Sequence, residues 1–325
     1  TAGVSVGSVL TIHNIAFQGL FPAHAFADLG LPIALFGMDG LEFWGRVSFM
    51  KGGLLFADRI TTVSPTYAAE IVTPEHGMGL DGVLRARGSA VSGILNGVDY
   101  AVWDPAADAL LPAPYGPGEL AGKARCKAAL QTEMGLAPDP DALLLGAVTR
   151  LTGQKGFDLV LDAAPSLAGL GCQLAMLGSG EPGLEDGFAR LARSDGSRIA
   201  VRIGYDEALA HRIIAGADAM LVPSRFEPCG LTQLYAMRYG TLPIVRRTGG
   251  LADTVSDARE AVGTGFLFDA VDPDALLGAA TRAALLRRDR PRWEAVVRAA
   301  MSTDFSWSRA AQRYAGLYRE IARPA

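Results

Sequence analysis

The second half of the chain alternates short apolar runs with helical patterns, and this alternation limits the possible folds more than any other feature. Strands that alternate with helices form βαβ units, which build a doubly wound parallel sheet. We therefore predict an α/β fold for this half. The predicted strands are Leu143–Thr149, Gln173–Leu177, Ile199–Ile203, Ala219–Val222, Leu242–Val245 and Gly265–Phe268. The predicted helices are Phe157–Ala168, Leu184–Arg193, Glu207–Ala215, Thr232–Arg238 and Pro273–Arg287.

The first half has a less regular pattern. Its predicted strands are Val9–Ile12, Asp58–Ser64 and Val91–Leu95, whereas Phe21–Phe56 is predicted as loop and helix. The aromatic residues of that segment indicate either a binding surface or core packing. At roughly 150 residues per domain, a chain of 325 residues has room for two domains. The Pro- and Ala-rich segment Asp99–Pro117 is typical of the connection between them.

The chain ends in a predicted helix, Ser306–Ala322. An apolar stripe along it predicts core packing, or packing against the first domain. The stripe consists of Trp307, Tyr314, Leu317, Tyr318 and Ile321.

The charge pattern argues against a nucleic-acid partner. The net charge is −4, and no basic stripe is present to neutralise phosphates. The one basic cluster, Arg282–Arg292, is interleaved with apolar residues and predicts a solvated helix face.

The remaining composition predicts a cytoplasmic protein. The three cysteines have no CxxC spacing, which indicates neither a disulfide framework nor a zinc site. No apolar run reaches the length of a membrane span, and the first ten residues lack a basic signal-peptide region, so we expect no membrane association.

An acidic turn follows the predicted strand Ala219–Val222. Glu227 lies in this turn, with Gly230 and Thr232 close behind it. Ligands of open α/β sheets bind at the carboxyl ends of strands, where helix N-termini direct free N–H groups at anions. The turn therefore predicts a site for a small polar ligand. The alternative is a surface loop whose acid is solvated.

A basic turn follows the predicted strand Leu143–Thr149. It contains Arg150 and Lys155 and leads into a helix, although it lacks the spacing of a phosphate-binding P-loop. Two cations at one turn suit a diphosphate, because charge-assisted hydrogen bonds are strong. The alternative is an exposed basic turn without a ligand.

Further loops at strand ends carry weaker signals. The glycines of Leu177–Gly180 and Thr248–Leu251 can expose backbone N–H groups to an anion. Tyr205 offers an aromatic face for a base or is simply packed, and His13 is either functional or structural. Together these loops predict a nucleotide diphosphate joined to a polyhydroxy group. No sequence motif indicates a metal, so cationic side chains and helix ends would stabilise the phosphates.

At this point the chain resembles the glycogen and starch synthase family. The matching segments are TIHNIAFQG, ITTVSPTYAAEI, ILNGVD, RLTGQKGFDLV, PSRFEPCGLTQLYAMRYGTLPIVRRTGGLADTV and the terminal DFSW stretch. The run Pro223–Val255 is specific to this family. Many related enzymes carry a second Glu eight residues after the first, whereas this position is Tyr235 here, as the resemblance leads one to expect.

The resemblance implies a GT-B fold with two Rossmann-like domains, the first of them truncated. Residues 1–97 would be the rest of the acceptor-side domain, and residues 98–302 the nucleotide-sugar-binding domain. Residues 303–325 would form a helix that packs back toward the first domain. The implied activity is retaining transfer of glucose from ADP-glucose to the non-reducing end of an α-1,4-glucan, without a cofactor or metal.

The resemblance also implies roles for individual residues. Arg150 and Lys155 would bind the diphosphate, Glu227 the glucose hydroxyls, and Tyr205 the adenine. His13 would act with them at the sugar and acceptor. The other implied substrate-binding residues are Asn14, Asn96, Cys229, Gly230, Leu231, Thr232, Thr248, Gly249 and Gly250. No residue is an obvious covalent nucleophile, so we expect attack from the face of the sugar that the leaving group departs from.

The chain departs from the family pattern at its N-terminus. Family members begin with a longer first domain, whose KTGGL loop supplies a lysine to the nucleotide sugar. We therefore expect that this chain is a fragment of a longer gene product. A catalytically inactive nucleotide- or glucan-binding module is the alternative function. A sucrose synthase is disfavoured by Tyr235, and a glycogen phosphorylase by the lack of a pyridoxal-binding lysine context.

Overall fold

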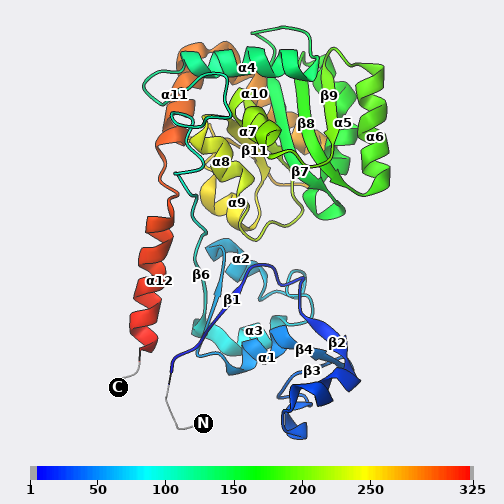
Figure 1. Ribbon diagram of the computed structural model, residues 1–325, viewed down its shortest axis with the longest axis vertical. Helices are drawn as coiled ribbons and strands as arrows, with labels where there is room; N and C mark the ends of the chain where they lie inside the picture. The colour runs from blue at the N-terminus through cyan, green and yellow to red at the C-terminus, as the bar shows by residue number, and fades with distance from the viewer. Residues whose placement is uncertain (1–5, 323–325) are drawn as a thin grey trace. The chain divides into compact units, whose positions relative to one another are not determined.

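The computed structural model describes residues 6–322 and divides them into two compact units (Figure 1). The first unit contains residues 6–97 and 307–322, and the second is Val98–Ser306. The predicted domains 1–97, 98–302 and 303–325, with their separate roles, stay a prediction.

The second unit is built on a six-stranded parallel sheet with the strand order β12-β11-β10-β7-β8-β9. Its strands are β7 (Leu144–Leu151), β8 (Gln173–Gly180), β9 (Ile199–Ile203), β10 (Ala219–Val222), β11 (Leu242–Arg246) and β12 (Phe266–Phe268). This confirms the predicted α/β fold, and β9 and β10 have the predicted bounds. All four side chains of β10 are buried, and its Met, Leu and Val side chains each contribute roughly 1.5–3 kcal/mol to folding.

Helices cover both faces of this sheet (Figure 1). They are α4 (Ala121–Met134), α5 (Phe157–Gly169), α6 (Pro182–Ser194), α7 (Glu207–Gly216), α8 (Thr232–Arg238), α9 (Gly249–Thr254), α10 (Pro273–Arg288) and α11 (Arg290–Ser302). The sequence pattern predicts neither α4 nor α11. In α4 the buried face includes Lys127 and Gln131, which interrupt the apolar pattern that marks a helix.

The expected solvated face at Arg282–Arg292 is wrong in part. Arg287 is buried, and its Nε lies 3.0 Å from Asp218. Arg282 is half-buried and donates to the Leu267 carbonyl at 2.6 Å. These arginines therefore hold α10 to the sheet.

The first unit contains two small sheets. The parallel sheet has the order β1-β5-β6, and the antiparallel sheet has the order β2-β4-β3. The strands are β1 (Val9–Ile12), β2 (Leu20–Pro22), β3 (Glu42–Phe43), β4 (Arg46–Ser48), β5 (Arg59–Thr62) and β6 (Val91–Gly93). The helices are α1 (Phe49–Phe56), α2 (Pro65–Glu70), α3 (Asp81–Arg87) and α12 (Trp307–Ile321), with three short 3-10 helices.

Two predictions for this unit are corrected. The segment 21–56 is not loop and helix alone, because β3 and β4 lie within it and β2 overlaps its start. In α12 the predicted apolar stripe is not a core face. Leu317 is buried, but Trp307 and Tyr318 are about half exposed.

The strand order of the second unit reverses between β7 and β10. From this seam, β8 and β9 extend the sheet in one direction, and β11 and β12 in the other. β7 pairs with β8 along its whole length, but with β10 only through Leu145 and Gly146. The two central strands therefore part toward their carboxyl ends. Such a switch point is where ligands bind in open α/β sheets.

Among residues 6–322, no helix combines the length and the apolar character that a membrane crossing requires.

Candidate active site

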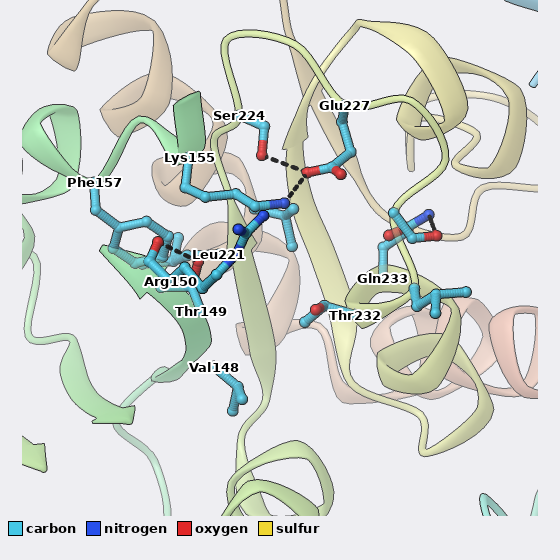
Figure 2. A pocket seen from close by; sticks show the side chains of 13 residues that line it. Val148, Thr149, Arg150, Lys155, Phe157, Leu221, Ser224, Glu227, Thr232 and Gln233 are labelled. Atoms are coloured by element: carbon cyan, nitrogen blue, oxygen red, sulfur yellow. Dashed lines mark hydrogen bonds and ion pairs between the residues drawn. The ribbon is translucent and has the colours of Figure 1, made fainter. Parts of the chain in front are cut away.

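A pocket of about 190 Å³ lies where β7 and β10 part (Figure 2). It is enclosed by the ends of these strands, the turns that follow them and the start of α8. Its lining residues are Val148, Thr149, Arg150, Lys155, Phe157, Leu221, Val222, Ser224, Glu227, Gly230, Leu231, Thr232 and Gln233. The predicted residues Arg150, Lys155, Glu227, Gly230, Leu231 and Thr232 are thus brought together in one place.

An ion pair forms part of the pocket wall. Lys155 Nζ is 2.6 Å from Glu227 Oε2, and the Ser224 hydroxyl donates to the same oxygen at 2.8 Å. Figure 2 shows these side chains pointing toward one another. Glu227 is only 6 % exposed, so the alternative of a solvated loop acid is wrong.

The pocket carries a net positive charge. Arg150, Lys155 and Glu227 are its only charged lining residues, which gives two cations and one anion. Arg150 is exposed, whereas Lys155 is held against the acid. Because opposite charges attract most strongly where water is excluded, the arrangement suits an anionic ligand.

Glycine is required at two turns of the pocket. Gly156 has φ +68°, and a Cβ there would lie 2.2 Å from the Pro223 carbonyl oxygen. Gly230 has φ +71°, and a Cβ would lie 2.3 Å from Gln233 Oε1. A side chain at position 156 would push apart the turns that carry Lys155 and Glu227, and one at position 230 would displace the buried Gln233 amide.

The other predicted residues of the second unit lie around the pocket rather than in its lining. Cys229 is buried in the Glu227 turn. Thr248 and Gly249 are buried at the start of α9, and the Gly250 N–H donates to the Glu227 carbonyl at 3.0 Å. This second turn therefore packs directly on the first.

Tyr205 lies in the turn between β9 and α7. It is 86 % exposed, which excludes the alternative of a packed tyrosine, and it is not part of the pocket lining. A stacking role for its ring stays a prediction.

Three residues with predicted substrate-binding or catalytic roles belong to the first unit. His13 is exposed directly after β1, and Asn14 Oδ1 accepts the Ala16 N–H at 3.0 Å. Asn96 is half-buried beside the buried Gly97. The expected roles of these residues stay predictions.

Two further residues of the pocket lining, Ser224 and Gln233, have no predicted role. Ser224 lies three residues before Glu227, a spacing that could have indicated its bond to the acid. Gln233 is fully buried, and its Nε2 donates to the Cys229 and Gly230 carbonyls, both at 3.0 Å. It fixes the backbone of the pocket wall.

In the part of the chain that the structure describes, no three His, Cys, Asp or Glu side chains gather closely enough to hold a metal ion.

The fold and the pocket place the chain in a broad class, the GT-B glycosyltransferases. Residues 135–298 match the family described as glycosyl transferases group 1. A sucrose-phosphate synthase from Thermosynechococcus elongatus has the same fold, with a TM-score of 0.60 at 20 % identity; the match covers 96 % of this chain and 67 % of that one.

Closer similarities narrow the class. Residues 3–86 match the family described as starch synthase catalytic domain. A glycogen synthase of Leptothrix cholodnii is 59 % identical over 97 % of this chain and 66 % of its own length. The catalytic domain of Arabidopsis thaliana starch synthase IV, solved with ADP and acarbose, has a TM-score of 0.91 at 38 % identity; the match covers 97 % of this chain and 67 % of that one.

The chain belongs to the glycogen and starch synthase family. It spans about two thirds of the length of the curated relatives that it matches.

Proposed function

We propose that this chain transfers glucose from ADP-glucose to the non-reducing end of an α-1,4-glucan, with retention at the anomeric carbon. The observation that carries the proposal is the Lys155–Glu227 ion pair in a cationic pocket at the sheet's switch point. It is supported by membership of the synthase family and by the ADP and acarbose of the Arabidopsis structure.

Donor binding is assigned to the basic side of the pocket. Arg150 and Lys155 would pair with the diphosphate of ADP-glucose, and backbone groups at Cys229–Leu231 would hold the sugar. Thr232 and the turn Thr248–Gly250 would contact the phosphates, and Tyr205 would stack on adenine. The reason is electrostatic: with two cations and one carboxylate, the lining attracts a diphosphate before any sugar contact forms.

Glu227 is assigned to the sugar. Its carboxylate would accept hydrogen bonds from glucose hydroxyls and offset the positive charge that develops as the bond to phosphate breaks. In the transfer step, the bond from C1 to the phosphate oxygen breaks and the acceptor hydroxyl forms a bond to C1 on the same face. The hydroxyl proton passes to the departing phosphate, so that protonated ADP leaves. Preorganised charges stabilise this departure.

The acceptor side is assigned to the first unit, where His13 and Asn14 would face the sugar and the glucan and Asn96 would lie in the hinge. The proposal requires no cofactor and no metal. We also propose a cytoplasmic location, because the three cysteines, all buried, are free in the structure.

The test is transfer of labelled glucose from ADP-glucose to glycogen by the chain as given, with ADP binding measured by calorimetry. UDP-glucose is assayed in parallel. We expect transfer from ADP-glucose and binding of ADP. Binding without transfer would contradict the proposed activity and leave an inactive nucleotide-binding module. Preferred transfer from UDP-glucose would contradict the donor.

A further inference from the structure

The loop that carries Glu227 is held by its main chain as well as by its side chain. Each of four successive carbonyl oxygens accepts a hydrogen bond from a neighbouring element. Arg246 at the end of β11 donates to the first two, at 3.1 Å for the first. Gln154 donates to the third at 3.2 Å, and Gly250 to the fourth at 3.0 Å. The four acceptors are Ser224, Arg225, Phe226 and Glu227.

Arg225 joins this loop to the turn that carries Lys155. Its N–H donates to the Gln154 carbonyl at 2.9 Å, and its Nη1 to the Gly153 carbonyl at 2.8 Å. The same guanidinium forms a two-pronged pair with Asp158 in the first turn of α5, at 2.7 and 2.6 Å. The Arg225 side chain thus contacts residues that precede and follow Lys155 in the chain.

The Arg225–Asp158 pair adds little to folding stability, so its role is to fix the geometry of the turn. The hydrogen bonds between the partners lower the pKa of the Asp158 carboxyl and raise that of Arg225, so both stay charged around neutrality. The side chains are 36 % and 41 % exposed, and ion pairs at that exposure add little to folding stability. The fixed fork of arginine nevertheless defines the positions of three acceptors.

Lys155 ends a three-residue 3-10 helix and is followed by Gly156 in the left-handed conformation. A short turn of this kind has few contacts of its own to fix the lysine. We infer that Arg225, paired with Asp158, is a positioning residue that sets the distance between Lys155 Nζ and the Glu227 carboxylate. This inference rests on the proposed function for its effect on catalysis, because small misplacements of reacting groups cost large factors in rate.

The kinetic test replaces either partner. Arg225→Lys and Asp158→Asn should each lower kcat about 10- to 100-fold while changing the dissociation constant of ADP less than about threefold. Asp158→Glu, which keeps the charge, should recover most of the turnover.

The matched control is Arg212→Gln. Arg212 forms a two-pronged pair with Glu133 at 2.7 Å in both contacts, with 25 % and 35 % exposure, and neither residue lines the pocket. The control should keep kcat within about twofold. A loss in Arg225→Lys no larger than in this control would overturn the inference, as would equal losses in kcat and ADP affinity.

A second test needs no activity. The coupling between Lys155→Met and Glu227→Gln is measured by urea unfolding in a double-mutant cycle, with Arg225 intact and with Arg225→Lys. We expect a coupling of about tenfold in the unfolding equilibrium constant that falls below about threefold without the arginine fork. If the chain transfers no glucose but the coupling falls in this way, the proposed function fails and the positioning role stands. An unchanged coupling overturns the positioning role whatever the activity.

Discussion

Two lysine–carboxylate pairs flank β10, one at each end. Asp218 precedes the strand and lies 2.8 Å from Lys127, whereas Glu227 follows it and lies 2.6 Å from Lys155. All four side chains are less than one-fifth exposed. By residue type, distance and burial the two pairs are nearly alike.

They differ in how many partners they have. Lys127 donates to Asp218 and to the Pro140 and Ala142 carbonyls. Asp218 also accepts the Leu144 N–H at 2.9 Å and lies beside Arg287.

In the described part of the chain, the Lys155 ammonium bonds to Glu227 alone, and Glu227 Oε2 adds only Ser224. The Lys127–Asp218 pair, with its several protein partners, fixes the fold, and we call it the saturated pair. The Lys155–Glu227 pair keeps hydrogen-bonding capacity for a ligand, and we call it the unsaturated pair.

The largest expected effect is on stability at the saturated pair. Asp218→Asn should lower the free energy of unfolding by about 3–5 kcal/mol, because it leaves Lys127 and Arg287 buried without a counter-ion. Glu227→Gln should cost no more than about 2 kcal/mol, since Lys155 is 18 % exposed and can turn to solvent. Urea unfolding measures both, and similar losses would remove the distinction between the pairs.

The unsaturated pair should show the opposite behaviour in catalysis. Glu227→Gln should lower kcat at least about 100-fold, because the offset to developing charge on the sugar is lost. The dissociation constant of ADP should change less than about threefold, since the cations remain. Steady-state kinetics and calorimetry test this, and a parallel loss of ADP affinity would speak against the assignment of Glu227 to the sugar.

A third buried lysine sharpens the comparison, because Lys123 has no carboxylate within pairing distance among the described residues. Its Nζ donates to the Ala215 and Tyr239 carbonyls and to the Thr241 hydroxyl. Burial lowers its pKa to about 7 from the ordinary 10.5. Between these values the unfolded chain binds more protons, so stability rises with pH by up to about 1.4 kcal/mol per unit.

The measurement is the free energy of unfolding at pH 7, 8 and 9 for the natural chain and for Lys123→Met. The variant should lack this contribution to the slope. Identical slopes in the two proteins would mean that Lys123 keeps its proton in the folded state.

The smallest expected effect lies outside the pairs, at Tyr205. Tyr205→Ala should weaken ADP binding by about 1 kcal/mol, the lower range for stacking of a base on an aromatic ring. Stability should change by less than about 0.5 kcal/mol, because the ring is exposed. Tyr318→Ala, which removes another exposed ring, is the control for calorimetry. Equal ADP affinity in both variants would withdraw the stacking role.

The same comparison explains what could be predicted from the sequence. The apolar runs of β9 and β10 define strands by themselves, and the turns after β7 and β10 carry Lys155 and Glu227 where sheet topology brings strand ends together. In contrast, α4 escaped prediction because Lys127 lies on its buried face. The partner that permits this burial, Asp218, is 91 residues away in the chain.

The periodicity of apolar residues therefore cannot reveal a buried charge whose partner is distant in the chain. Arg287 was assigned to solvent for the same reason. The antiparallel sheet of the first unit was missed on other grounds, because its strands have two or three residues, too few for an alternating pattern to appear.

Because β7 and β10 part early, the number of paired residues differs strongly between neighbouring strands of the sheet. Eight residue pairs tie β7 to β8, but only two tie β7 to β10. The seam with the fewest ladder pairs therefore runs directly beneath the pocket. At the carboxyl end, the turns that follow the two strands are joined instead by the contacts of Arg225 and Lys155. The pocket thus lies where contacts between turns take over from the strand ladder, while eight residue pairs hold β7 to β8 on its other side.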